Sequence, residues 1–331
     1  MNEATLVQHP YSSLTPDVVL DAVESLGFVC DARIFPLNSY ENRVYQVGIE
    51  DEAPLIVKFY RPGRWQAEQI QEEHDFSAEL DALDVPVVAP WRDNDNRSLF
   101  EHEGFMFALY PRRGGRAPDL EAADDLEVLG RLMGRLHAVG TQRTFQHRPT
   151  LSVQSFGTDS VSFLVQSGAV PESLLPSYEA VAMPLLEGIE AAFAAVSFTP
   201  IRLHGDCHPG NILWRDGAAH FVDLDDARNG PAIQDLWMLL TGDRAHQTGA
   251  LSDVMEGYQQ FHDFNFAELA LIEPLRALRS LHYAAWLARR WEDPSFPMHF
   301  PWFGDERYWG EHIMTLREHV EALQEPPLTL W

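Results

Sequence analysis

The polar stretch IRLHGDCHPGNILW at residues 201–214 lies between two apolar runs, and it constrains the fold more than any other segment of the chain. A tight turn requires glycine or proline, but this stretch adds two histidines, an aspartate and an asparagine at close spacing. After the turn RDGA, the strand-like run HFVDL follows at 220–224. The pattern therefore predicts a polar loop and a hairpin that returns Asp223 to the side of Asn211.

Asp206, Asn211 and Asp223 would form an oxygen-rich pocket. Such oxygens suit Mg²⁺, which usually completes its octahedron with phosphate and water, and Asp206 would remain nearby as a base. Three interpretations are open at this point. The first is a polar hairpin with solvated acids. The second is a hydrolytic metal site with His204, Asp206 and His208 as ligands. The third is phosphoryl transfer, which needs a base, an Asn and an Asp on the metal, and a lysine on the nucleotide phosphates.

Charge and composition narrow the classes of protein. Asp and Glu outnumber Lys and Arg by 50 to 24, and the formal charge of −26 argues against sequence-independent binding to DNA or RNA. No run approaches the roughly 18 apolar residues of a membrane span. Two cysteines, Cys30 and Cys207, give no disulfide framework. We therefore expect a reduced, cytoplasmic, monomeric protein that binds neither nucleic acid nor membrane.

Hydrophobic periodicity divides the chain into two parts. In the first part, the pattern predicts a helix from Thr15 to Gly27 and an inserted helix at 65–83. It also predicts β-rich runs at 44–49, 55–61, 85–91 and 104–111. The segment PRRGGRAP at 111–118 is a candidate linker. Helices are then predicted at 125–139, 176–196, 232–241, 251–262, 268–291 and 305–323. We therefore predict two domains, 1–110 with a small antiparallel sheet and 111–331 with mostly helices.

The run HGDCHPGN followed by FVDLDDA resembles the catalytic loop and metal-binding motif of the aminoglycoside phosphotransferase and choline kinase-like superfamily. The segments LNSYENRVYQV, IVKFYRP, EEH, ARNGPAIQDLWMLL and EPLRALR extend the resemblance to the bacterial stress response kinase A family, over residues 11–328. The resemblance implies an α+β, bilobal protein-kinase-like fold with a small antiparallel-sheet N-lobe and a larger, mainly helical C-lobe. It also implies an ATP- and Mg²⁺-dependent serine/threonine protein kinase of the cytoplasm.

The resemblance assigns roles to the loop and the hairpin. Asp206 corresponds to the proton acceptor, and Asn211 and Asp223 correspond to the Mg²⁺ ligands. Asp225 and Asp226 also crowd this motif. Asp223 is preferred because the aspartate of the superfamily directly follows the buried strand, here FV.

Lys58 lies in the apolar run LIVKFY, and the kinase interpretation pairs it with the ATP phosphates and with a glutamate of the helix at 65–83. Glu72 and Glu73 are both candidates. Glu73 is favoured because it lies three residues after Ile70 and so faces inward with it.

The glycine-rich loop of protein kinases is absent, and NSYENR at 38–43 takes its place. The resemblance points to Ser39 as a nucleotide contact in this loop. An ordinary polar turn is the alternative, because Asn and Ser favour turns.

The phosphate acceptor stays open. The family label implies a protein serine or threonine, but the fold also includes homoserine, choline and aminoglycoside kinases, and fold does not determine substrate. A nucleotide-binding protein without turnover is a further alternative. Five residues would share one face of the helix at 268–291: Arg276, Arg279, Tyr283, Trp286 and Arg290. This stripe either borders an acceptor groove, or its arginines are paired with acids in the core.

Overall fold

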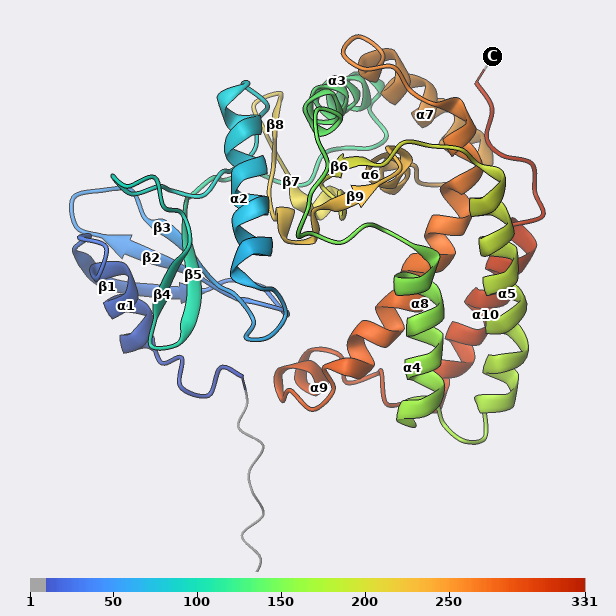
Figure 1. Cartoon of the computed structure of the whole chain (residues 1–331), viewed down its shortest axis with the longest axis horizontal. Helices are drawn as coiled ribbons and strands as arrows, with labels where there is room; N and C mark the ends of the chain where they lie inside the picture. The colour runs from blue at the N-terminus through green and yellow to red at the C-terminus, as the bar shows by residue number, and fades with distance from the viewer. Residues whose placement is uncertain (1–9, 331) are drawn as a thin grey trace, which may run out of the picture. The chain divides into compact units, whose positions relative to one another are not determined.

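The structure is a computed structural model that describes residues 10–330 (Figure 1). Backbone contacts divide the chain into two units, and each is described by itself. Unit 1 comprises Met1–Gly115 and Asp293–Ser295, and unit 2 comprises Arg116–Glu292 and Phe296–Trp331. Within residues 10–330, no helix combines the length and the apolar composition needed to cross a membrane.

Unit 1 is built on a five-stranded antiparallel sheet with the order β1-β2-β3-β5-β4. Its strands are β1 (Cys30–Pro36), β2 (Arg43–Ile49), β3 (Leu55–Phe59), β4 (Phe100–His102) and β5 (Phe105–Pro111). The helices are α1 (Pro16–Glu24) and α2 (Ala67–Ala82). As predicted, Thr15 caps α1 by accepting a hydrogen bond from the Val18 amide, and Gly27 follows at a φ of 94°.

The two faces of this sheet carry different chemistry. One face packs with α1 in an apolar core that includes Val19, Val57 and Phe59. Because side chains alternate along a strand, Lys58 lies on the other face, where Tyr60, Ile70 of α2 and Ala108 form a second, smaller cluster.

The predicted strand at 85–91 is wrong, because the chain forms no ladder there. Pro86 and Pro90 lack the amide hydrogens that a strand needs. The two edge strands, β1 and β4, were not predicted. Strand β1 carries an irregular register between Cys30 and Ile34, and β4 has only three residues.

Unit 2 is mainly helical. Its helices are α3 (Ala123–Gly140), α4 (Asp159–Ser167), α5 (Leu175–Ala195), α6 (Ile233–Leu236), α7 (Arg244–Tyr258), α8 (Ile272–Arg289), α9 (Ser295–His299, whose first residue belongs to unit 1) and α10 (Glu306–Ala322). Helices α4, α5, α8 and α10 enclose one core, with Leu164, Leu185, Leu281 and Trp309 fully buried. Helix α3 approaches α7 closely, because a Cβ on Gly130 would lie 2.0 Å from the Val254 carbonyl oxygen.

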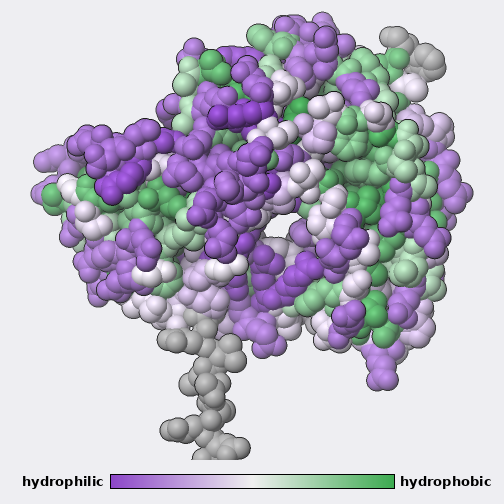
Figure 2. All heavy atoms as spheres, viewed as in Figure 1, coloured by the Kyte–Doolittle hydropathy of each residue, from purple (hydrophilic) through white to green (hydrophobic). Residues whose placement is uncertain are grey.

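The helices predicted at 176–196 and 305–323 agree with α5 and α10 to within a residue. Helix α7 begins earlier than predicted, because Asp243 caps it by accepting a hydrogen bond from the His246 amide at 3.0 Å. The predicted helix at 232–241 is α-helical over only four residues and continues as a 3₁₀ turn. On the visible face, hydrophilic residues predominate over unit 1, whereas hydrophilic and hydrophobic residues are mixed over unit 2 (Figure 2).

Candidate active site

The predicted hairpin is present in unit 2. Strands β7 (Ile212–Arg215) and β8 (Ala218–Phe221) pair antiparallel around a turn in which Asp216 and Gly217 both have positive φ, as a tight hairpin requires. The Val222 amide donates to the Asn211 carbonyl oxygen at 3.0 Å. The backbone therefore returns to Asn211 one residue before Asp223.

A buried carboxylate fixes the polar loop from below. Asp235 of α6 accepts hydrogen bonds from the amides of His204 at 2.7 Å and Gly205 at 2.8 Å. His137 donates its Nε2 hydrogen to the same carboxylate at 3.2 Å. Gly205 has a φ of 88°, and a Cβ there would lie 2.1 Å from the Asp226 carbonyl oxygen. Glycine is therefore required at this turn, and Asp235 anchors the loop through two of its backbone amides.

Asp206 and Asn211 lie in one hydrogen-bonded loop. The side-chain nitrogen of Asn211, Nδ2, donates to the Asp206 backbone carbonyl oxygen at 3.0 Å. The side-chain oxygen of Asn211 is therefore the atom that remains for a metal. The Asp206 carboxylate is 23% exposed and accepts a hydrogen bond at Oδ1 from Arg279 of α8. His208 Nε2 lies 3.7 Å from Asp206 Oδ2.

The three aspartates after β8 have different surroundings. Asp223 is exposed and has left-handed backbone angles, φ 60° and ψ 59°, which are costly for a non-glycine residue and are often found at functional sites. Asp225 is only 4% exposed. Asp226 pairs with Arg228 at 2.8 Å. Of the three, Asp223 has the exposure that a metal ligand needs.

The structure argues against a hydrolytic metal site formed by His204, Asp206 and His208, because His204 is not available as a ligand. His204 is fully buried, donates from Nε2 to the Val222 carbonyl oxygen at 2.9 Å and accepts from the Asp206 amide at Nδ1. Neither ring nitrogen is left for a metal. Among the described residues, no group of three or more His, Cys, Asp or Glu side chains could hold a metal ion.

Cys207 is a packing residue. Its thiol is fully buried against the Met133 sulfur at 3.8 Å, and burial raises its pKa well above the ordinary value. A raised pKa disfavours the reactive thiolate.

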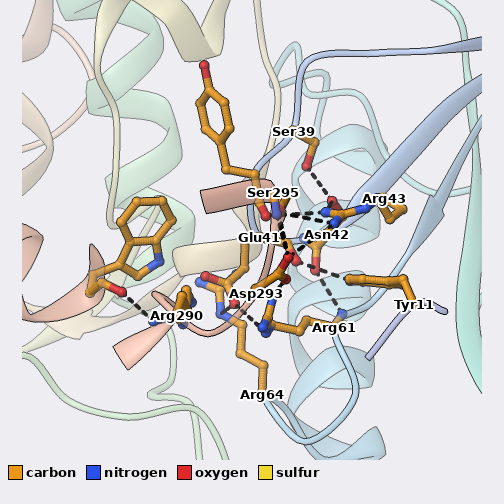
Figure 3. Close-up of polar contacts among 12 residues, drawn as sticks. Tyr11, Ser39, Glu41, Asn42, Arg43, Arg61, Arg64, Arg290, Asp293 and Ser295 are labelled. Atoms are coloured by element: carbon orange, nitrogen blue, oxygen red, sulfur yellow. Dashed lines mark hydrogen bonds and ion pairs between the residues drawn. The ribbon is translucent and has the colours of Figure 1, made fainter. Parts of the chain in front are cut away.

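The loop that replaces the glycine-rich loop lies in unit 1, between β1 and β2 (Figure 3). Ser39 donates its hydroxyl hydrogen to the Asn42 carbonyl oxygen at 3.1 Å. Asn42 is 3% exposed, and its side-chain oxygen accepts from the Arg61 amide at 3.1 Å. Tyr11 donates to the Glu41 carbonyl oxygen at 3.1 Å. Polar side chains, rather than glycines, therefore shape this loop.

The sequence analysis missed the anchor of this loop. Asp293 and Ser295 come from the far end of the sequence but belong to unit 1 (Figure 3). Arg61 Nη1 donates to Asp293 Oδ2 at 2.8 Å, and Arg43 Nη2 lies 3.8 Å from Asp293 Oδ1. Arg43 also donates to the Ser295 hydroxyl at 3.2 Å. The Asp293 side chain is only 1% exposed. A carboxylate as buried as this one needs a paired charge, and Arg43 and Arg61 supply it.

Lys58 and Glu73 are both buried, at 6% and 2% exposure. Lys58 lies on β3, and its Nζ is 5.3 Å from the centre of the Tyr60 ring. Glu73 lies on the buried side of α2, whereas Glu72 is half-buried. Burial therefore favours Glu73 as the inward-facing glutamate, and its pairing with Lys58 stays a prediction.

The three arginines of the stripe on α8 make different contacts. Arg276 donates to the Glu273 carboxylate at 2.7 Å and to the Leu240 carbonyl oxygen at 3.1 Å. These contacts give Arg276 a structural role. Arg290 donates to the Trp286 carbonyl oxygen at 3.3 Å, and its guanidinium lies 5.3 Å from the Trp286 ring centre. Arg279 alone of these three contacts Asp206.

Comparison with known proteins places this geometry in a family. A profile of the phosphotransferase enzyme family matches residues 33–297. Stress response kinase A of Escherichia coli strain K12 is 47% identical over 97% of this chain and 97% of its own length. The chain belongs to the phosphotransferase enzyme family. The serine/threonine protein kinase RdoA of Salmonella typhimurium strain LT2 is 45% identical over the same shares. The recognised resemblance to stress response kinase A is therefore confirmed, and the protein is a kinase.

Solved structures confirm the predicted fold class. Amicoumacin kinase hAmiN, in complex with AMP-PNP, Ca²⁺ and Ami, matches with a TM-score of 0.73 at 17% identity, over 95% of this chain and 96% of that one. A microcompartment-associated aminopropanol kinase matches with a TM-score of 0.68 at 18% identity, over 94% of this chain and all of its own. At these identities the likeness shows the fold alone.

Proposed function

We propose that this kinase transfers the γ-phosphoryl group of ATP, in a Mg²⁺-dependent reaction, to serine or threonine hydroxyls of proteins. The observation that carries the proposal is the loop and hairpin of unit 2, where Asn211 bonds the Asp206 backbone, the hairpin returns to Asn211 one residue before Asp223, and Asp235 is buried beneath the loop. The name of the Salmonella relative, a serine/threonine protein kinase, supports the choice of acceptor.

The roles follow from the chemistry of each group. Asp206 accepts the proton of the acceptor hydroxyl. Asn211 and Asp223 offer an amide oxygen and an exposed carboxylate, an oxygen set that fits Mg²⁺. When bound, Mg²⁺ neutralises charge on the phosphates. Residues 1–110 form the lobe that covers the nucleotide, with Ser39 and Lys58 as phosphate contacts and Glu73 orienting Lys58. Residues 111–331 form the catalytic lobe.

A small-molecule alcohol is the second candidate acceptor. Amicoumacin kinase and aminopropanol kinase share the fold, and both are named for small molecules. Incubation with radiolabelled ATP and Mg²⁺, alone and with a cell extract, separates the two candidates. Label in protein supports our proposal, and label found only in metabolites contradicts it.

Two variants test the assigned residues. Asp206→Asn should lower transfer by about 10²–10⁴-fold while ATP binding persists, because a positioned base contributes that much. Asp223→Ala should lose Mg²⁺-dependent stabilisation by ATP, and Asp225→Ala should lose less of it. The reverse order in a thermal-shift titration would move the metal ligand to Asp225. A cytoplasmic, monomeric state stays a prediction, which cell fractionation and light scattering test.

A further inference from the structure

Arg279 contacts the carboxylate that is assigned as the base. Its Nη1 donates to Asp206 Oδ1, and within residues 10–330 this carboxylate is the one polar partner of Arg279. The Arg279 side chain is 43% exposed. Because an ion pair as exposed as this one adds little to stability, its place beside the base calls for a different explanation.

The other arginines around the aspartates donate to the backbone. Arg148 donates from Nε to the Ala227 carbonyl oxygen at 2.8 Å and from Nη2 to that of Asp225. Arg228 donates from Nε to the Asp226 carbonyl oxygen at 2.7 Å. These two arginines hold the turn after β8, whereas Arg279 keeps most of its donors for a ligand.

His208 is the second cation candidate beside the base. Its Nδ1 accepts a hydrogen bond from the Gly210 amide at 3.0 Å. Its Nε2 lies 3.7 Å from Asp206 Oδ2, beyond hydrogen-bond distance, whereas Arg279 donates directly to Asp206 Oδ1. Because a guanidinium stays protonated in proteins, Arg279 supplies the permanent positive charge on the Asp206 carboxylate.

The backbone of Arg279 is held rigidly. Helix α8 buries Leu275, Leu278 and Leu281 in unit 2. Position 279 is thus fixed by a packed helix rather than by a loop, and rigid elements place reactive groups most accurately.

Phosphoryl transfer needs a positive charge at this point. The hydroxyl oxygen forms a bond to the γ-phosphorus, the bond from that phosphorus to the bridging oxygen breaks with its electrons remaining on ADP, and the hydroxyl proton passes to Asp206. Charge is spread over the equatorial oxygens of the transferred group, and an arginine that contacts them accelerates the reaction. On the basis of the proposed function, we propose that Arg279 is a catalytic residue that contacts the transferred phosphoryl group beside Asp206.

Recognition of an anionic acceptor is the competing role. Tyr283 and Trp286 stack on α8 with ring centres 5.7 Å apart, next in line after Arg279, and would suit an acceptor groove. That role depends on an acceptor that carries a negative group near its hydroxyl. The phosphoryl group passes Asp206 in every turnover, whatever the acceptor.

Hydrolysis of ATP by water, measured with Mg²⁺ and without any acceptor, separates these roles. The variants are Arg279→Gln and Arg279→Lys. Arg289→Gln is the matched control, because Arg289 is exposed on the same helix and donates to the Asp159 carbonyl oxygen. For each protein, the affinities for ATP and for ADP with aluminium fluoride, a mimic of the transferred group, and the melting temperature are measured as well.

We expect Arg279→Gln to lower kcat for hydrolysis and for transfer by about 10²–10³-fold. ATP affinity and melting temperature should stay near wild type, and the tighter binding of the aluminium fluoride mimic should be lost. Arg279→Lys should recover part of the rate, and Arg289→Gln should match wild type.

Normal hydrolysis with a raised KM for the acceptor would overturn the inference in favour of acceptor recognition. A lower melting temperature with an unchanged rate per folded molecule would overturn it in favour of a structural role. A wild-type protein that turns over no ATP would overturn the proposed function, and this inference with it.

Discussion

Two polar loops, residues 37–42 of unit 1 and residues 204–211 of unit 2, are each held by one buried carboxylate, but through different kinds of donor. Asp235 accepts hydrogen bonds from backbone amides of its loop, those of His204 and Gly205. Asp293 contacts the ends of two long side chains, Arg43 and Arg61.

The difference concerns how directly each anchor fixes the backbone. A hydrogen bond to an amide fixes the main chain itself, so the position of Asp206 depends directly on Asp235. An arginine side chain has several rotatable bonds, and the loop behind it keeps more freedom. We therefore expect loss of Asp235 to reduce kcat and loss of Asp293 to act mainly on KM for ATP.

The largest effect is expected from Asp235→Ala. The change leaves the His204 and Gly205 amides and His137 without their buried acceptor. We expect a loss of about 3–5 kcal/mol in the free energy of unfolding and at least about 10²-fold in kcat. Urea unfolding and turnover measure the two effects. Glu256→Gln, an exposed change on α7, is the control, and equal losses in both variants would contradict the anchoring role.

Acid should destabilise unit 2. Burial lowers the pKa of three of its histidines, His282, His312 and His319, to about 4. Between pH 6.5 and 4 the unfolded chain binds the proton and the folded one does not, so stability falls as pH falls through this window. For His312, which is 7% exposed, the loss is at most about 3 kcal/mol.

Hydrogen exchange at pH 7.5 and 4.5, resolved by unit, measures this loss. The His312→Gln variant should weaken the pH dependence. The matched change His246→Gln removes an exposed histidine whose pKa is raised by its hydrogen bond to Asp243, and it should not weaken it. An unchanged slope in His312→Gln would exclude His312 as the source.

Asp293→Asn is expected to have an intermediate effect. It removes the negative charge between Arg43 and Arg61, whose side chains are 19% and 13% exposed. We expect a loss of about 2 kcal/mol in stability and a rise of about tenfold in KM for ATP, with kcat nearly constant. Steady-state kinetics with Glu292→Gln as the exposed neighbouring control test this. A fall in kcat equal to that of Asp235→Ala would remove the distinction between the loops.

The smallest effect is expected from Ser39→Ala. Its hydroxyl makes one hydrogen bond, to the Asn42 carbonyl oxygen. Loss of this bond should cost about 1 kcal/mol in stability, and thermal unfolding measures it. As a proposed phosphate contact, Ser39 should also raise KM for ATP when replaced, by less than the roughly tenfold rise expected for Asp293→Asn, and an unchanged KM would contradict that contact.

The sequence predicted the unit 2 loop well because its contacts are local. Asn211 and Asp223 are twelve positions apart, and the Asp-Gly turn between them specifies the hairpin that joins them. Arg61 and Asp293 are 232 positions apart, and no periodic pattern relates them. Residues 293–295 follow a segment of unit 2 directly in the sequence, yet they belong to unit 1. Long-range pairing of charges leaves no signal in one sequence.

The return of Asp293–Ser295 to unit 1 limits how this chain can be divided. A fragment that ends at Gly115 would keep Arg43 and Arg61 but lose the anion that neutralises them. A chimaera that exchanges only the first 115 residues with a relative would combine arginines from one parent with a carboxylate from the other. The genetic unit that carries the first lobe is therefore discontinuous, and an exchange that preserves it needs two crossovers beyond residue 115, one on each side of residues 293–295.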